Sequence, residues 1–121
     1  MKIKNEAMLI TYPDSLGNNL KDLEHVLDTH LKGVVGGVHI LPFFPSSGDR
    51  GFSPMDYTKV DERFGGWEDI KRISEKYYMM YEFMLNHISA QSPYYLDFLE
   101  KKEESPYKDY FIRYNDYWPE N

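Results

Sequence analysis

Short apolar runs alternate with amphipathic segments along the first half of the chain. Residues 7–12 (AMLITY) are apolar and stop at the breaker Pro13, which predicts a buried strand. Residues 20–31 repeat leucine and valine at helical spacing with charged positions between them, and Asn19 can cap that helix. Residues 34–41 form a second apolar segment of β type, interrupted by two glycines. The order predicted so far is strand, helix, strand.

The second half continues the alternation after a long loop. The loop, 45 to about 64, is rich in Gly, Pro, Ser and Asp, and loops of this length inside compact domains are usually functional or disordered. Residues 67–77 then predict a helix, residues 78–85 a third strand, and residues 92–103 a further helix. Strands alternating with helices predict a parallel α/β sheet with right-handed crossovers. Three strands are too few to close a barrel.

Composition narrows the class of protein. The chain has 121 residues, enough for one ordinary domain, with 41% hydrophobic and 28% charged residues. A net charge of −6 argues against a general nucleic-acid or membrane-surface partner, which would require a basic patch. The absence of cysteine excludes disulfides, thiolate nucleophiles and cysteine-type zinc sites, and it fits a cytoplasmic location. No signal peptide or membrane-spanning run is expected.

Three groups of polar and aromatic residues follow the three predicted strands, at 12–14, 42–57 and 86–89. Ligands of parallel α/β proteins bind beyond the carboxyl ends of the strands, so these groups should face one site. The middle group mixes carboxylates, aromatic rings and a flexible glycine. This mixture suits a sugar, because carboxylates accept hydrogen bonds from hydroxyls and an aromatic face covers the C–H face of a pyranose. The alternative is a solvated loop with a local ion pair between Asp49 and Arg50.

Histidine offers a second candidate for chemistry. His87 follows the third strand and can act as a general acid or base, a metal ligand or a plain hydrogen-bond donor; the alternative is a structural role. His25, His30 and His39 form no metal-ligand spacing, and His39 is expected inside the second strand. No H-E-x-x-H, P-loop or G-x-G-x-x-G motif is present.

Three stretches match a known family: LITYPDSLG, GGVHILPFFPSSGDRGFSPMDYTKVDERFG and FMLNHIS. They resemble the sucrose phosphorylases of the α-amylase superfamily, over residues 8–119. The resemblance implies a retaining double displacement, in which an Asp attacks the glucosyl carbon of sucrose and a Glu serves as acid and then base. Inorganic phosphate, as co-substrate, then takes the glucosyl group and yields α-glucose 1-phosphate. No metal or organic cofactor is implied.

The resemblance also assigns roles to residues of this chain. Asp49 is expected to hold hydroxyls of the glucosyl ring, Phe52 to form the aromatic wall of that subsite, and His87 to donate to the glucosyl 6-hydroxyl. The supporting positions in the same loops are Asn86, Asp56 and Tyr57.

One position departs from the family pattern. Glu82 stands where the family has an Asp that organises the barrel interior near the site. A carboxylate one methylene longer must shift its tip, which costs about 1–3 kcal/mol in a packed site. Lower activity or stability is therefore expected.

The expected fold class is α/β, as the N-terminal part of a (β/α)₈ TIM barrel, which needs about 250 residues when complete. Residues 1–91 are expected to supply barrel strands one to three, and residues 92–121 the start of an inserted domain B. The nucleophile and the acid/base are expected beyond Asn121, so the chain alone is predicted to be inactive. An open sheet edge, with inward side chains such as Met84 lacking an opposite wall, predicts marginal stability and self-association.

Three other interpretations remain at this stage. The chain could be a free-standing carbohydrate-binding or protein-interaction module, which would need a self-sufficient fold. It could be a small flavodoxin-like domain, although residues 12–17 make a poor phosphate-binding loop. Within the family, the substrate could instead be sucrose 6′-phosphate or glucosylglycerate.

Overall fold

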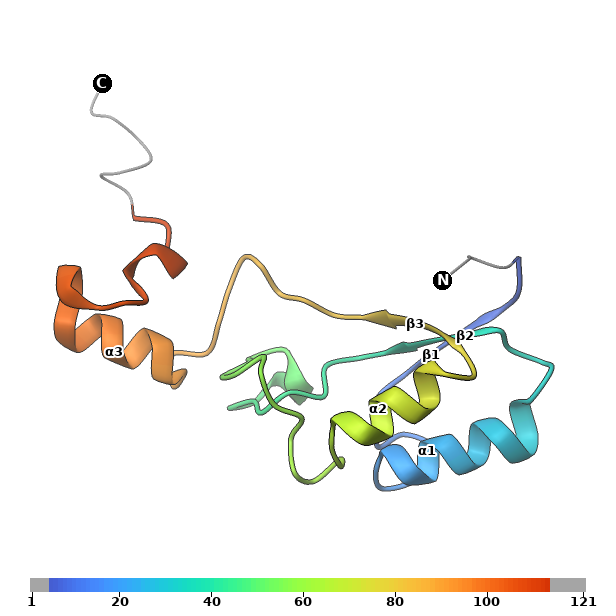
Figure 1. The fold of residues 1–121 in the computed structure, drawn as a ribbon. Helices are drawn as coiled ribbons and strands as arrows, with labels where there is room; N and C mark the ends of the chain where they lie inside the picture. The colour runs from blue at the N-terminus through green and yellow to red at the C-terminus, as the bar shows by residue number, and fades with distance from the viewer. Residues whose placement is uncertain (1–4, 114–121) are drawn as a thin grey trace.

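The computed structural model describes residues 5–113, and its centre is a parallel three-stranded sheet (Figure 1). The strands are β1 (Met8–Thr11), β2 (Gly37–Ile40) and β3 (Tyr78–Tyr81), in the order β1-β2-β3. Met8 pairs with Gly37, which pairs with Tyr78 on its other side. The predicted parallel α/β arrangement is therefore confirmed.

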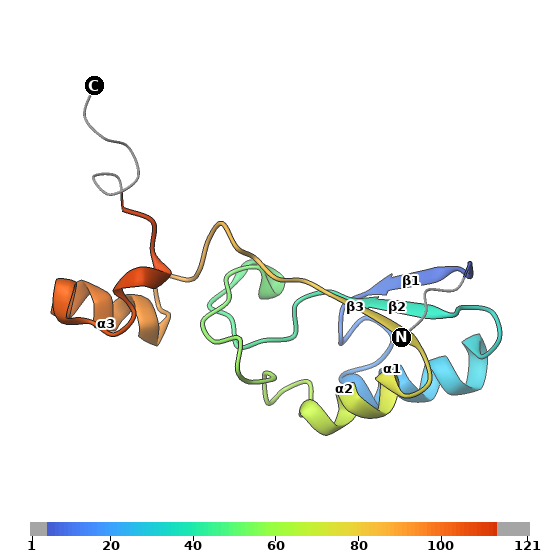
Figure 2. The ribbon, with the colours of Figure 1, turned by 45° about the horizontal axis from the view of Figure 1, so that its top comes forward.

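Two helices cover one face of this sheet, α1 (Leu20–Val26) and α2 (Trp67–Ser74) (Figures 1 and 2). The predicted cap is present, since the Asn19 side chain accepts a hydrogen bond of 3.0 Å from the backbone N–H of Asp22. The predicted helix 20–31 is α-helical only over its first seven residues and continues as the π-helical turn η1 (Leu27–Leu31). The core between helices and sheet includes the fully buried Leu20, Leu23, Leu27, Val38, Ile40 and Ile73.

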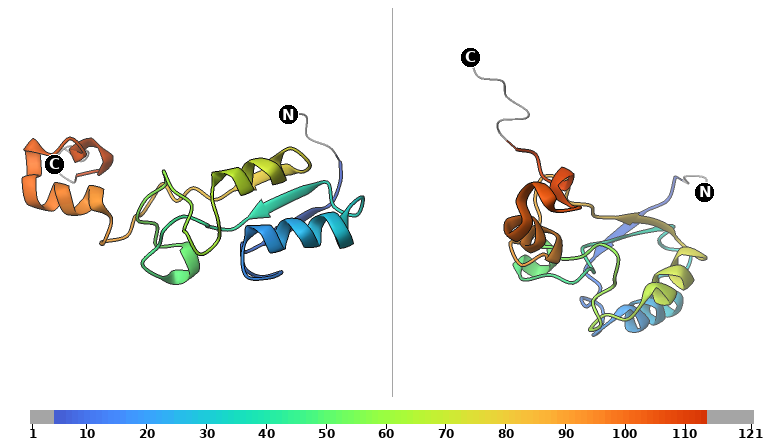
Figure 3. Two further views of the ribbon diagram at one scale, coloured as in Figure 1. Left: turned by 60° about the horizontal axis from the view of Figure 1, so that its bottom comes forward. Right: turned by 60° about the vertical axis from the view of Figure 1, so that its left-hand side comes forward.

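The opposite face of the sheet carries no helix in the described part of the chain (Figure 3). Ile10 is 62% exposed and Met80 is 43% exposed there. Met84, which was expected to lack an opposite wall, is nevertheless only 9% exposed. Its backbone is bonded to the Tyr57 hydroxyl, which draws this segment against the long loop.

The third strand is shorter than the predicted segment 78–85, and pairing stops at Tyr81. Its partner strand β2 ends at Ile40 and is soon followed by Pro42, which has no N–H to donate to a ladder. Beyond Tyr81 the chain runs in extended form to α3 (Pro93–Lys101), which stands apart from α1 and α2 in every view (Figures 1–3).

Short 3₁₀ turns complete the described structure. They are η2 (Asp49–Gly51) in the long loop, and η3 (Lys102–Glu104) and η4 (Lys108–Tyr110) after α3. No helix within residues 5–113 is long and apolar enough to cross a membrane. Residues 114–121, the end of the predicted domain B segment, lie outside the described residues.

Candidate functional site

The long loop presents a tight turn with an unusual backbone at the carboxyl ends of the strands. Four consecutive residues, Gly48 to Gly51, have positive φ, with values of 159°, 51°, 49° and 98°. Gly51 must be glycine, because a Cβ there would lie 2.7 Å from the carbonyl oxygen of Pro42. The Ser46 hydroxyl lies 2.7 Å from the Gly48 carbonyl oxygen and 2.8 Å from that of Ser53. The turn is thus braced from within the loop.

The residues assigned to the glucosyl ring are linked through this turn. The backbone N–H of Phe52 donates to the Asp49 carbonyl at 3.0 Å, and Nε2 of His87 lies 2.7 Å from the Phe52 carbonyl oxygen. The Nδ2 amide of Asn86 lies 2.9 Å from Nδ1 of His87. A neutral imidazole with its proton on Nε2 satisfies both contacts at once. Both ring nitrogens of His87 are therefore occupied by protein partners.

Further hydrogen bonds join the loop that follows β3 to the long loop that follows β2. Ser89 donates its backbone N–H to the Pro54 carbonyl at 2.8 Å, and its hydroxyl lies 2.6 Å from that of Ser47. The Ser92 hydroxyl donates to the Met55 carbonyl at 2.9 Å. Sequence reasoning missed these serines, because serine is common in any loop and these contacts span 35 residues or more.

The Tyr57 hydroxyl makes two hydrogen bonds with the backbone of Met84, as a neighbouring strand would. It donates to the Met84 carbonyl at 3.1 Å and accepts from the Met84 N–H at 2.9 Å. Burial raises the pKa of Tyr57, so the hydroxyl stays protonated and able to do both. The contact fixes the chain three residues before His87.

Asp56 joins the same loop to α3. Its Oδ1 accepts from the Thr58 N–H at 2.8 Å, the Thr58 hydroxyl at 2.7 Å and the Tyr94 hydroxyl at 3.0 Å. Burial raises the pKa of Asp56, but these hydrogen bonds more than offset burial and hold the pKa below its ordinary value. The carboxylate is therefore ionised at neutral pH and committed to structural contacts.

Glu82 lies away from the turn, on the open face of the sheet. Its Oε1 is 2.9 Å from Nε2 of His39, whose neighbours Val38 and Ile40 are buried beneath the helices. The contact lacks hydrogen-bond geometry, and the buried Nε2 of His39 has no hydrogen-bond partner within residues 5–113. As predicted, His39 lies inside the second strand.

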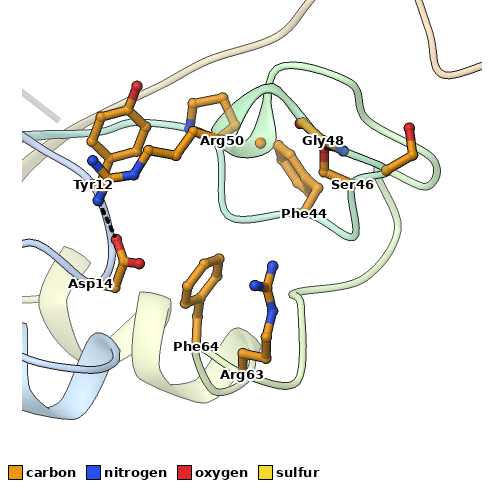
Figure 4. Close-up of a pocket in the computed structure, with 11 residues that line it drawn as sticks. Tyr12, Asp14, Phe44, Ser46, Gly48, Arg50, Arg63 and Phe64 are labelled. Carbon is orange, nitrogen blue, oxygen red and sulfur yellow. Dashed lines mark hydrogen bonds and ion pairs between the residues drawn. The ribbon is translucent and has the colours of Figure 1, made fainter.

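A cavity of about 260 Å³ opens beside the turn (Figure 4). Arg50 crosses its rim, with Nη2 3.1 Å from Oδ1 of Asp14 and its guanidinium 4.1 Å from the centre of the Tyr12 ring. Arg50 thus pairs with Asp14, and not with the adjacent Asp49 as the alternative interpretation of the loop supposed. The other lining side chains include Phe44, Ser46, Arg63 and Phe64.

A larger cavity, of about 770 Å³, lies between the segment after β3 and α3. Asn86 and His87 line it together with an aromatic group that includes Phe83, Tyr94, Phe98, Tyr110 and Phe111. Within the described part of the chain, no three His, Asp or Glu side chains are grouped as a metal site would require.

Comparison with known proteins identifies the family. A family model described as the catalytic domain of α-amylase matches residues 12–121 of this chain. The chain belongs to the α-amylase family. Its three parallel strands and their helices are accordingly part of the barrel of that catalytic domain, with the sheet open.

Several proteins with high sequence similarity to this chain are phosphorylases. The chain is 57% identical over 121 residues to sucrose phosphorylase of Streptococcus mutans, covering 100% of this chain and 25% of the relative. It is 51% identical over 118 residues to sucrose 6(F)-phosphate phosphorylase of Thermoanaerobacterium thermosaccharolyticum, covering 98% of this chain and 24% of the relative. The chain therefore spans about a quarter of the length of these relatives.

Solved structures give the same picture. The crystal structure of sucrose 6F-phosphate phosphorylase from Thermoanaerobacter thermosaccharolyticum superimposes with a TM-score of 0.88 at 51% identity, over 98% of this chain and 24% of that one. An isomaltulose synthase mutant (D241A) from Erwinia rhapontici NX5 in complex with D-glucose matches with a TM-score of 0.73 at 26% identity, over 88% of this chain and 21% of that one.

Proposed function

We propose that this chain supplies the glucosyl-binding side of a sucrose phosphorylase. The reaction is transfer of the glucosyl group of sucrose to phosphate, with release of fructose and formation of α-glucose 1-phosphate by retaining double displacement. The 57% identity to the Streptococcus mutans sucrose phosphorylase, over the whole chain, supports this reaction above others.

The observation that carries the proposal is the connected turn at the carboxyl ends of the strands. Asp49, Phe52 and His87 come from two separate loops, and the backbone of Phe52 bonds to both of the other residues. Asp49 and His87 are solvent-exposed and Phe52 is half-exposed, so a ligand can reach them. A carboxylate, an aromatic ring and an imidazole are groups suited to binding a pyranose, and these hydrogen bonds bring the three residues to one edge of the sheet.

Each side chain has a distinct part in this proposal. Asp49 accepts hydrogen bonds from ring hydroxyls, and Phe52 covers the apolar face of the sugar. His87 donates to the 6-hydroxyl only after a rearrangement, because its Nε2–H already faces the Phe52 carbonyl. Sugar binding must therefore exchange that hydrogen bond for one to the 6-hydroxyl.

The nucleophile and the acid/base would come from the other five strands of a complete eight-stranded barrel. The 121 residues alone are then inactive, and their open sheet face favours self-association. Inorganic phosphate is the co-substrate, and the proposal needs no metal or organic cofactor. A cytoplasmic location remains a prediction from composition.

A second candidate concerns the acceptor side. Relatives named sucrose 6(F)-phosphate phosphorylase and glucosylglycerol phosphorylase are 51% and 49% identical to this chain. Sucrose, sucrose 6(F)-phosphate and glucosylglycerol, which these names print, are all glucosides. The acceptor group is then the feature on which the candidates differ.

The test is a chimaera in which this chain is followed by the remaining sequence of the Streptococcus mutans enzyme. It is assayed with phosphate and either sucrose, sucrose 6′-phosphate or glucosylglycerol, by release of glucose 1-phosphate. We expect Asp49→Asn to lower kcat/KM roughly 10- to 100-fold, because a charged hydrogen-bond acceptor is lost. Asp109→Asn, at an exposed position on η4, is the matched control and should change nothing. Equal activity of the two variants would contradict the proposed role of Asp49.

A further inference from the structure

Arg50 occupies a backbone conformation that its side chain does not favour. Its φ and ψ are 49° and 42°, in the left-handed region. Aspartate tolerates this region better than most residues, but a long side chain such as arginine does so only where its surroundings compensate. Asp49 before Arg50 and Gly51 after it also have positive φ, of 51° and 98°. Arg50 therefore cannot leave the left-handed region by shifting the positive φ to an adjacent residue.

The compensating contacts come from the segment that follows β1. The Arg50 guanidinium lies over the Tyr12 ring at 4.1 Å and reaches Oδ1 of Asp14 at 3.1 Å (Figure 4). The ion pair joins positions 36 residues apart in sequence. The opposite side of the same turn is bound by the segment after β3, through His87 and the Phe52 carbonyl. The turn is thus held from both neighbouring strand ends.

We propose that Arg50, stacked on Tyr12 and paired with Asp14, is a positioning residue that fixes the turn which presents the Asp49 carboxylate to the glucosyl ring. This inference rests on the proposed function for its ligand, but the hold on the turn can be measured without it. Stacking over an aromatic ring and pairing with a carboxylate each contribute modestly at an exposed site. Because the backbone of the turn is strained, these two contacts determine what fraction of molecules have the turn in the described conformation.

An anion site at the same cavity is a weaker interpretation. Arg63 also lines this cavity, but its Nη2 is 2.8 Å from Oδ2 of Asp61 and its Nε is 3.0 Å from Oδ1. Arg50 is likewise paired with Asp14. Both guanidiniums therefore already have carboxylate partners, and Arg63 provides a matched control for loss of a guanidinium at this cavity.

The first test is hydrogen exchange on the 121-residue chain. The Gly51 and Phe52 amides donate to the Gly48 and Asp49 carbonyls at 3.2 and 3.0 Å, so their exchange reports the turn directly. We expect Arg50→Gly and Asp14→Ala to speed this exchange about 3- to 10-fold, and Arg63→Ala to leave it unchanged. Arg50→Gly relieves the backbone strain but removes the contacts with Tyr12 and Asp14. If those contacts hold the turn, exchange becomes faster despite the relieved strain, so unchanged or slower exchange in that variant would overturn the proposal. Asp14→Ala breaks the same hold without altering the backbone preference at position 50.

The second test uses the active chimaera and separates KM from kcat. We expect Arg50→Gly to raise the KM for sucrose about 3- to 10-fold with kcat within twofold, and Arg50→Lys, which keeps a cation for Asp14, to recover part of the loss. A variant that merely unfolds would instead lose kcat at unchanged KM, and that result, like an unchanged KM, would count against a positioning role. If the unsubstituted chimaera has no activity, the proposed function fails, and hydrogen exchange still decides whether Arg50 holds the turn.

Discussion

The two faces of the three-stranded sheet differ sharply. On the covered face, Leu23 and Ile40 are fully buried beneath α1 and α2. The helices are tied by Glu24, which lies 2.7 Å from Nζ of Lys76 and 3.1 Å from Nε of Arg72. On the open face, Ile10 is largely exposed and Met80 is nearly half-exposed. Side chains alternate between the two faces along each strand, but within the described residues helices cover only one of these faces.

The contrast teaches where stability and binding reside in this chain. Burial of apolar side chains stabilises the covered face, because each buried leucine or isoleucine contributes about 1.5–3 kcal/mol. The long loop adds Phe44 and Val60 to the same core, but its exposed turn around Asp49 is held by hydrogen bonds and by the Asp14–Arg50 pair. The covered face keeps the chain folded, and the loops at its edge carry the site that we propose.

The largest predicted loss of stability comes from a substitution in the core of the covered face. Leu23→Ala should lower the free energy of unfolding by about 2–5 kcal/mol, because it leaves a cavity in the core. Ile10→Ala, on the open face, should change the free energy of unfolding by less than about 0.5 kcal/mol, because the side chain is already largely hydrated. Urea unfolding followed by circular dichroism measures both. Equal losses would mean that the open face is covered in solution.

A somewhat smaller effect is expected in the loop. Gly51→Ala should cost roughly 2–4 kcal/mol, because its φ disfavours alanine and its Cβ would clash with the Pro42 carbonyl. Gly33→Ala is the matched control, since Gly33 also has positive φ but nothing lies within 4 Å of the added Cβ. The control should lose only about 1 kcal/mol, from backbone strain alone. Similar losses in the two variants, by thermal melting, would show that the turn is free to move.

The smallest effect concerns the Glu82–His39 contact on the open face. Glu82→Asp shortens the side chain and withdraws it from His39, but the contact has no hydrogen-bond geometry to lose. The free energy of unfolding should therefore change by less than about 1 kcal/mol in urea unfolding of this chain. A larger loss would mean that the pair stabilises the open face by itself. A gain in activity on making the same change in the chimaera would support the view that aspartate fits this position better.

Local features of the fold were predictable from sequence, and long-range contacts were not. Asn19 is a cap that depends on neighbours three residues away, and apolar periodicity placed both covering helices. The early end of β3 depends on Pro42 in another strand's loop, which apolar runs do not reveal. The Arg50–Asp14 pair and the Tyr57–Met84 bonds join distant segments. Such partners become visible only once the fold brings them together.

For the candidate site, too, the sequence predicted the general location but not the individual long-range contacts. Parallel topology alone brings the strand-end loops of Asp49, Phe52 and His87 to one edge. Their assignment to the glucosyl ring, and the division of the chain at residue 91, remain predictions that depend on the resemblance. The engagement of both His87 nitrogens by protein groups was not foreseen, because tautomer and orientation depend on the Asn86 amide and the Phe52 carbonyl.

The most direct test of the proposed function compares the 121-residue chain with the chimaera in one assay. Both are given sucrose and phosphate, and glucose 1-phosphate is measured. We expect product from the chimaera and none from the chain alone, because the proposal assigns sugar-binding loops to this chain and the nucleophile and acid/base to the rest of the barrel. Product from the chain alone would contradict the proposal, since both catalytic groups would then have to lie among residues to which we give binding and structural roles.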